Sequence, residues 1–126
     1  MNSVLWVVQL LLAATFLVHG WLYLSPPPDV AVQINASLPR WFSQFIGVAE
    51  VLAAVGLTLP GLTGILPWLV TWAAAGLMIV TISATGYHLM RGEHSAAAIT
   101  LLLFTMAAFL AYMRHRFVPI GGRRAP

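Results

Sequence analysis

The chain contains no cysteine and no lysine among its 126 residues. Without cysteine it forms no disulfide, thiolate metal site or iron–sulfur cluster, and it performs no dithiol redox chemistry by itself. Charge is scarce as well, since only 7% of the residues are charged and only Asp29, Glu50 and Glu93 are acidic. A soluble domain has about 25% charged residues. The composition therefore excludes an ordinary soluble protein.

What the sequence has in abundance is long apolar runs, with 60% hydrophobic residues overall. A spanning helix needs about 20 mostly apolar residues to cross about 30 Å of hydrocarbon. Four segments meet that length: Val4–Leu24, Trp41–Leu59, Ile65–Leu89 and Ser95–Met113. We expect an all-α, multi-pass protein whose single transmembrane domain is a four-helix bundle in a lipid bilayer. The first run lacks a preceding basic residue and is too long for a signal peptide, so we expect a retained helix.

Proline, glycine and charged residues mark the breaks between these segments. Three consecutive prolines, at positions 26–28 of the loop 25–40, favour extended backbone, although the apolar residues of the loop suggest that it lies along the membrane surface. The segment Pro60–Gly64 predicts a tight turn. The polar segment before the last helix predicts a second turn, with Ser95 as the helix cap.

The arginines predict the topology. Four of the six lie near the C-terminus, in a basic tail at residues 114–126, and single arginines precede the second and fourth helices. Positive residues favour the cytoplasmic side. We therefore expect both termini inside and the loop 25–40 outside. Clustered arginines at a chain end are typical of a membrane anchor, so we expect no nucleic-acid partner.

Glu50 is the most informative single residue, because it lies near the middle of an apolar segment. An ionised group at the centre of a bilayer costs about 2.5–3.5 kcal/mol on insertion scales. Such a residue usually faces the interior of a bundle or a cavity. Glu50 therefore indicates where a site would lie.

Small or polar residues recur on one face of each predicted helix, at a spacing that suits helix packing. In chain order these are Gln9, Phe16, His19 and Tyr23; Ser43, Gly47, Glu50 and Ala54; Thr71, Met78, Thr81, Thr85 and His88; and Ala98, Thr105 and Tyr112. A second stripe, Ala49, Ala53 and Gly56, predicts helix–helix packing.

Depth and side-chain direction bring three of these residues together. At 1.5 Å per residue, Glu50 lies about 15 Å, His19 about 8 Å and His88 about 5 Å from the outer face. Helical side chains lean toward the N-terminus of their own helix. Glu50 therefore leans outward and both histidines lean inward. We expect a Glu/His cluster that binds a proton or a small ligand, with Gln9, Tyr23, Thr81 and Thr85 as further candidates.

Plainer interpretations remain open for each group. His19 fits a core histidine bonded to a backbone carbonyl, His88 fits an interfacial residue beside Arg91, and Glu50 fits a neutral structural acid. No ligand spacing supports a metal site. The sequence identifies no catalytic residue. We expect the chain itself to hold no cofactor.

At these residues the sequence resembles the DoxX-like family of small four-helix membrane proteins. The resemblance rests on four motifs in chain order: Phe16-x-x-x-Gly20, Leu38-Pro39-x-Trp41 leading into Gly47-x-x-Glu50, Leu57-x-Leu59-Pro60-x-Leu62-Thr63, and His88-x-x-Arg91-Gly92-Glu93. Many relatives continue the first motif to a lysine where this chain has Tyr23. The last motif adds Arg91 and Glu93 as loop candidates.

The resemblance implies a protein of the bacterial cytoplasmic, or inner, membrane. One related branch, DoxD, is a subunit of a thiosulfate:quinone oxidoreductase. This implies an accessory or redox-associated subunit that binds a quinone or lipid in the Glu/His pocket, with a partner redox subunit or further copies of itself. Two other hypotheses stay open: a structural or assembly protein in which Glu50 is an internal hydrogen-bond partner, and a proton-coupled small transporter.

Overall fold

The computed structural model describes residues 1–121 and contains five helices in that range. Four are long enough and apolar enough to cross a membrane: α1 (Asn2–Leu24), α3 (Arg40–Thr63), α4 (Leu69–Met90) and α5 (His94–Arg116). The fifth, α2 (Pro28–Ser37), is short. The described chain has no strand. The fold predicted from the sequence, an all-α four-helix membrane bundle, is confirmed.

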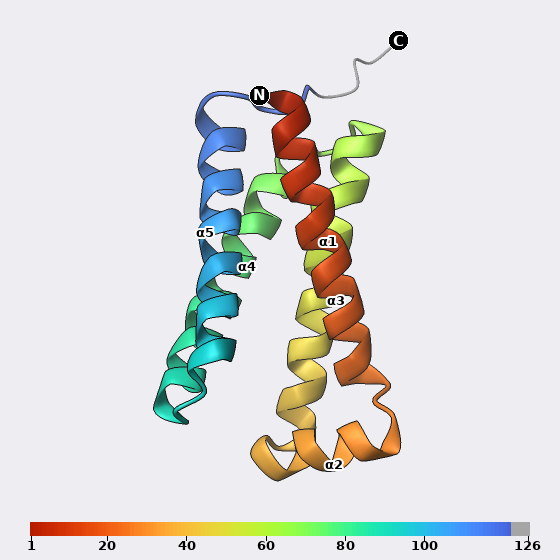
Figure 1. Ribbon diagram of the computed structural model, residues 1–126. Helices are drawn as coiled ribbons and strands as arrows, with labels where there is room; N and C mark the ends of the chain where they lie inside the picture. Colours follow the sequence, from red (N-terminus) through yellow and green to blue (C-terminus); the bar gives the residue numbers. More distant parts are fainter. Residues whose placement is uncertain (122–126) are drawn as a thin grey trace.

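The long helices form two pairs. α1 packs along α3 and α4 packs along α5, and these are the two most extensive helix contacts in the molecule. The α3–α4 contact and the smaller α1–α5 contact join the pairs into one bundle (Figure 1). We call the end with the N-terminus and the α3–α4 loop the inner end, and the end with α2 and the α4–α5 turn the outer end, following the predicted topology.

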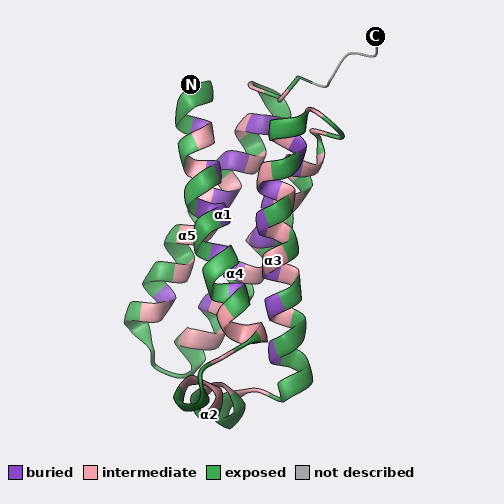
Figure 2. Ribbon diagram, turned by 90° about the vertical axis from the view of Figure 1, so that its right-hand side faces the viewer, coloured by how far each residue is buried: buried purple, intermediate pink, exposed green. Residues whose placement is uncertain are grey.

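The hydrophobic core lies mainly in the inner half of the bundle, where all four long helices contribute to it. The burial pattern in Figure 2 follows the same inward faces. The buried apolar cluster consists of Leu5, Leu12, Ala13, Phe16, Ala54, Leu57, Val70, Ala74, Leu77, Ala107 and Leu110. Val118 and Ile120, beyond the end of α5, also pack against it.

Two predicted turns differ from the structure. α3 continues through Pro60 and ends at Thr63, and Gly64 follows as the C-cap with a positive φ of 70°, which suits glycine. Proline removes one helical hydrogen bond, but in the last turn of a membrane helix that loss is tolerated. Ser95 is not a cap: α5 begins at His94, and Glu93 precedes it without a side-chain capping bond.

The outer loop also differs from the extended segment that its prolines suggest. Its non-helical residues are 25–27 and 38–39, and Pro28 begins α2, where proline needs no N–H donor. Asp29 in the first turn suits the positive end of the helix dipole. α2 lies crosswise at the outer end, against α3, and none of its residues is buried (Figure 1).

The face predicted for the last helix is wrong. Ala98, Thr105 and Tyr112 are all exposed. The buried face carries Ala97, Ala107, Leu110 and Arg114 instead. The prediction followed polar residues, whereas α5 packs through small and apolar ones. α5 also extends to Arg116, so two arginines of the predicted tail are helical, while Arg123 and Arg124 lie outside the described residues.

Candidate functional site

Glu50 and His19 form a hydrogen-bonded pair between α1 and α3. The distance between His19 Nδ1 and Glu50 Oε2 is 2.6 Å, so one proton lies between the two atoms. Glu50 is only 3% exposed, whereas the His19 side chain is 46% exposed. The pair therefore consists of an acid enclosed by protein and an imidazole that protein covers only in part.

Two glycines allow the close approach that this pair requires. A Cβ on Gly20 would lie 2.9 Å from the backbone oxygen of Gly47, and a Cβ on Gly47 would lie 2.9 Å from that of Gly20. Each glycine is within three residues of a member of the pair in its own helix. Small residues let membrane helices approach closely. The motif residues Gly20 and Gly47 thus set the helix spacing at which His19 reaches Glu50.

Tyr23 lies one helical turn from His19, and the two ring centroids are 4.6 Å apart in a tilted arrangement. Tyr23 is partly buried. The family resemblance implies a lysine at this position in many relatives. In this chain the Tyr23 ring packs beside the imidazole, and residue 23 places no positive charge next to Glu50.

His88, the third group of the expected cluster, binds elsewhere. Its Nδ1 lies 3.2 Å from Glu93 Oε1, and Arg91 Nε donates to the same oxygen at 2.9 Å. Arg91 also donates to the Tyr87 hydroxyl at 3.2 Å. The turn between α4 and α5 therefore supplies His88 with a nearer carboxylate than Glu50.

This turn is a second ion-pair cluster, on the outer surface. Hydrogen bonds from His88 and then Arg91 lower the pKa of the Glu93 carboxyl. The same carboxylate raises the pKa of the Arg91 guanidinium. Both side chains are exposed, so the cluster is solvated and orders the turn.

The remaining candidates lie apart from the pair. Thr81 is buried, but its hydroxyl donates to the Leu77 carbonyl of its own helix at 2.7 Å. Thr85 is 2.8 Å from the Thr100 hydroxyl and joins α4 to α5. Gln9 is fully buried in the inner half and donates to the Leu57 carbonyl. Of the seven pocket candidates, only His19 and Glu50 share a hydrogen bond between two side chains; Thr85 Oγ1 also donates to the Thr81 carbonyl of its own helix.

Sequence reasoning missed Arg114, which is 2% exposed. It donates to Gln9 and to Asn2, and its guanidinium lies over the Trp6 ring. A signal was present, because Ala107, Leu110 and Arg114 have the spacing of a buried helix face. The sequence assigns the arginine at the end of that series to the basic tail at residues 114–126 instead.

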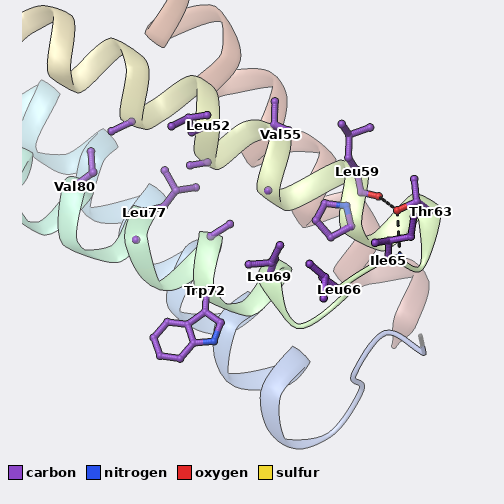
Figure 3. Close-up of a pocket in the computed structure, with 16 residues that line it drawn as sticks. Leu52, Val55, Leu59, Thr63, Ile65, Leu66, Leu69, Trp72, Leu77 and Val80 are labelled. Atoms are coloured by element: carbon purple, nitrogen blue, oxygen red, sulfur yellow. Dashed lines mark hydrogen bonds between the residues drawn. The ribbon is translucent and has the colours of Figure 1, made fainter. Parts of the chain in front are cut away.

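An apolar groove of about 660 Å³ runs between α3 and α4 in the inner half (Figure 3). Its α3 side begins at Ala49 and Leu52, next to Glu50 in sequence, and extends to Thr63. Its α4 side includes Trp72 and Leu77. The predicted packing stripe Ala49, Ala53 and Gly56 lines this groove, and a Cβ on Gly56 would lie 2.9 Å from the Ala73 Cβ.

Comparison with known protein families decides the classification. The profile of the DoxX-like family matches residues 7–110, which include all four long helices in whole or in large part. The chain belongs to the DoxX-like family. Neither the comparison with curated proteins nor that with solved structures found a match. Membership, together with four apolar spans, makes this DoxX-like chain a small multi-pass integral membrane protein.

The chemistry of the pair is proton binding and hydrogen bonding. Within residues 1–121, His19 makes its only side-chain hydrogen bond through Nδ1, so Nε2 remains to bond a ligand. The described chain brings no three His, Asp or Glu side chains together as metal ligands. The site therefore offers one imidazole nitrogen, oriented by a buried acid.

Proposed function

We propose that this DoxX-like protein binds a lipid-soluble, carbonyl-bearing ligand of the quinone class at His19 and Glu50, as an accessory subunit of a redox assembly in the bacterial cytoplasmic membrane. The observation that carries the proposal is the asymmetry of the pair. Glu50 is enclosed, while the imidazole bonded to it is nearly half exposed within a membrane span. A hydrogen bond that only joined α1 to α3 would not require an exposed imidazole.

The roles of the two residues follow from their hydrogen bond. Glu50 holds Nδ1 and so fixes the ring orientation, as a carboxylate behind a working histidine commonly does. With Glu50 as the carboxylate, the protonated imidazole donates its Nδ1–H to Glu50 and its Nε2–H to a ligand carbonyl oxygen. Reduction of a quinone to a quinol consumes two electrons and two protons. The Nε2–H of the protonated imidazole supplies one of these protons and water supplies the other, while Nδ1–H stays on the bond to Glu50. The electrons come from a partner subunit.

The groove between α3 and α4 supports a ligand with an apolar tail. It begins at Ala49 and Leu52, at the depth of Glu50, and continues toward the inner end on a neighbouring face of α3. Its lining is almost entirely apolar. A ring at His19 with a chain along α3 would occupy both features.

Binding of a short-tailed quinone in nanodiscs, measured by quenching of tryptophan fluorescence, tests the proposal. Glu50→Gln keeps the shape but frees the imidazole orientation, so we expect the dissociation constant to rise by about tenfold, the effect of a charge-assisted hydrogen bond. Glu93→Gln is the matched control, because it breaks the other His–Glu pair, outside the span. Equal quinone affinity in the wild type and both variants would refute the proposal.

A structural role is the second candidate, favoured by one observation. The backbones of Gly20 and Gly47 meet beside the pair, so the His19–Glu50 bond also ties α1 to α3. If stability is its only purpose, Glu50→Gln lowers the unfolding midpoint and leaves ligand binding and redox coupling unchanged. The binding role predicts that Glu50→Gln weakens ligand binding and leaves the unfolding midpoint nearly unchanged.

A further inference from the structure

Arg114 is a buried cation at the inner end, far along the bundle from His19 and Glu50. Its Nε donates to Gln9 Oε1 at 3.2 Å, and its Nη1 donates to Asn2 Oδ1 at 2.7 Å and to the Val118 carbonyl at 3.1 Å. The Trp6 ring centroid is 5.6 Å from the guanidinium carbon. All these partners are neutral.

The second terminal nitrogen, Nη2, is buried and has no hydrogen-bond partner among the described residues. The sequence has only three acidic residues, and none of them reaches it. Glu50 binds His19, Glu93 binds His88 and Arg91, and Asp29 lies in α2 at the outer end. The negative end of the α5 dipole favours a cation here but does not bond Nη2. Burying a charge without a counter-charge costs free energy, so we expect an anion to bind this guanidinium.

A short segment covers the guanidinium. Residues 117–121, which we call the strap, leave α5 and cross the inner end of the bundle near the N-terminus (Figure 1). The strap is held by the Val118 carbonyl on Arg114 and by Ile120, which packs near Gly61 of α3. It is not a helix: the N–H groups of Phe117 and Val118 donate to the Met113 carbonyl, and Val118 and Ile120 pack against the core.

We propose that Arg114 binds the phosphate of an anionic lipid in the leaflet at the inner end. One phosphate oxygen binds Nη2, and another takes the place of the Val118 carbonyl on Nη1. Two parallel N–H···O contacts from one guanidinium are the favoured geometry for phosphate. Loss of the Val118 bond lifts the strap and opens the guanidinium to the headgroup region.

Two features favour a lipid over free phosphate. His115 and Arg116 are exposed in the last turn of α5, beside the site, where they attract anionic headgroups. The apolar groove reaches the same turn of α3, since Pro60 and Thr63 line it while Gly61 lies under the strap. A phosphate at Arg114 therefore has a surface for an acyl chain nearby.

The test uses the full chain in a maltoside detergent that contains no phosphate. Phosphatidylglycerol, diacylglycerol with the same acyl chains, and inorganic phosphate are titrated separately, and bound lipid is counted by native mass spectrometry. Arg114→Gln removes the charge, and Arg40→Gln, which removes an exposed arginine at the outer end, is the control. We expect phosphatidylglycerol to bind the wild type and the control, and to bind Arg114→Gln about tenfold more weakly.

The absence of cysteine provides a second measurement that does not depend on the folding of Arg114→Gln. A spin label on Gly121→Cys, at the exposed end of the strap, should become more mobile when phosphatidylglycerol is added. Equal binding of diacylglycerol or inorganic phosphate overturns a lipid phosphate as the ligand. Equal loss in Arg40→Gln, or a label that does not respond, overturns Arg114 as the site. Quinone binding at His19 is unaffected by either result, so the two proposals fail separately.

Discussion

The inner and outer halves of the bundle are built differently. In the inner half, leucines and alanines from all four long helices meet in one core. In the outer half, contacts run mainly within each pair: Gly20 against Gly47 in one, Thr85 against Thr100 in the other. The inner half can therefore hold the fold while the outer half keeps a polar pair, His19 and Glu50, only partly covered. Stability and the proposed ligand site are therefore separated along the membrane normal.

The largest expected effect is in the inner core. Leu12 is fully buried, and Leu12→Ala should lower the free energy of unfolding by about 2–5 kcal/mol, the cost of a core cavity. Leu17 on the same helix is 48% exposed, and Leu17→Ala should change it by less than about 0.5 kcal/mol. Unfolding in mixed micelles with sodium dodecyl sulfate, followed by tryptophan fluorescence, measures both. Similar losses for the two variants would contradict the location of the core.

The α1–α3 contact in the outer half gives the next effect. Gly47→Ala places a Cβ 2.9 Å from the Gly20 backbone oxygen, which cannot rotate away, so we expect a loss of about 1–3 kcal/mol from overpacking. It should also part His19 from Glu50 and weaken quinone binding. Gly86→Ala is the control, because a Cβ there meets nothing within 4 Å. If Gly47→Ala had the same free energy of unfolding as the wild type, the close approach of α1 and α3 at Gly20 and Gly47 would be contradicted.

A smaller effect is expected within the other pair. Thr85→Val keeps the shape but removes the bond between α4 and α5, so the loss should be about 0.6 kcal/mol, the average for such bonds in a membrane. Thr105 bonds only the Leu101 carbonyl of its own helix. Thr105→Val should therefore be neutral in the same unfolding assay. A larger loss at Thr105 than at Thr85 would mean that α5 packs through the face predicted from the sequence.

The smallest effect concerns pH at the outer turn. Because the pKa of Glu93 is lowered in the folded chain, its contribution to stability is complete above the unfolded value of 4.5 and is lost as the pH falls through the lower folded value. The unfolding midpoint of the wild type should therefore fall slightly more below pH 4.5 than that of Glu93→Gln. Parallel pH profiles for the two proteins would show that this cluster contributes nothing.

The sequence predicted the four spanning helices and the packing face of α3 well, for physical reasons. Apolar runs of spanning length define helices, and the stripe Ser43, Gly47, Glu50 and Ala54 is entirely buried. Depth and side-chain direction placed His19 near Glu50 because both lie on regular helices. These features depend on local geometry, which the sequence specifies directly.

Other features depend on competition between partners. His88 had two carboxylates within its expected reach, and the sequence does not rank Glu93 against Glu50. Arg114 is buried because Asn2 and Gln9, more than a hundred positions away, supply acceptors. Such long-range pairing is set by the packing of α5 on α1. The Arg114 pattern was visible only as a periodic position on α5.

The central claim is that His19 presents Nε2 to a ligand while Glu50 holds Nδ1. The most direct test is nitrogen NMR of histidine-labelled protein in nanodiscs, with a short-tailed quinone added. We predict that the Nε2 signal of His19 shifts while its Nδ1 signal keeps the signature of the Glu50 bond, and that the exposed His94 and His115 do not respond. An unchanged His19 Nε2 signal at saturating quinone would contradict the claim.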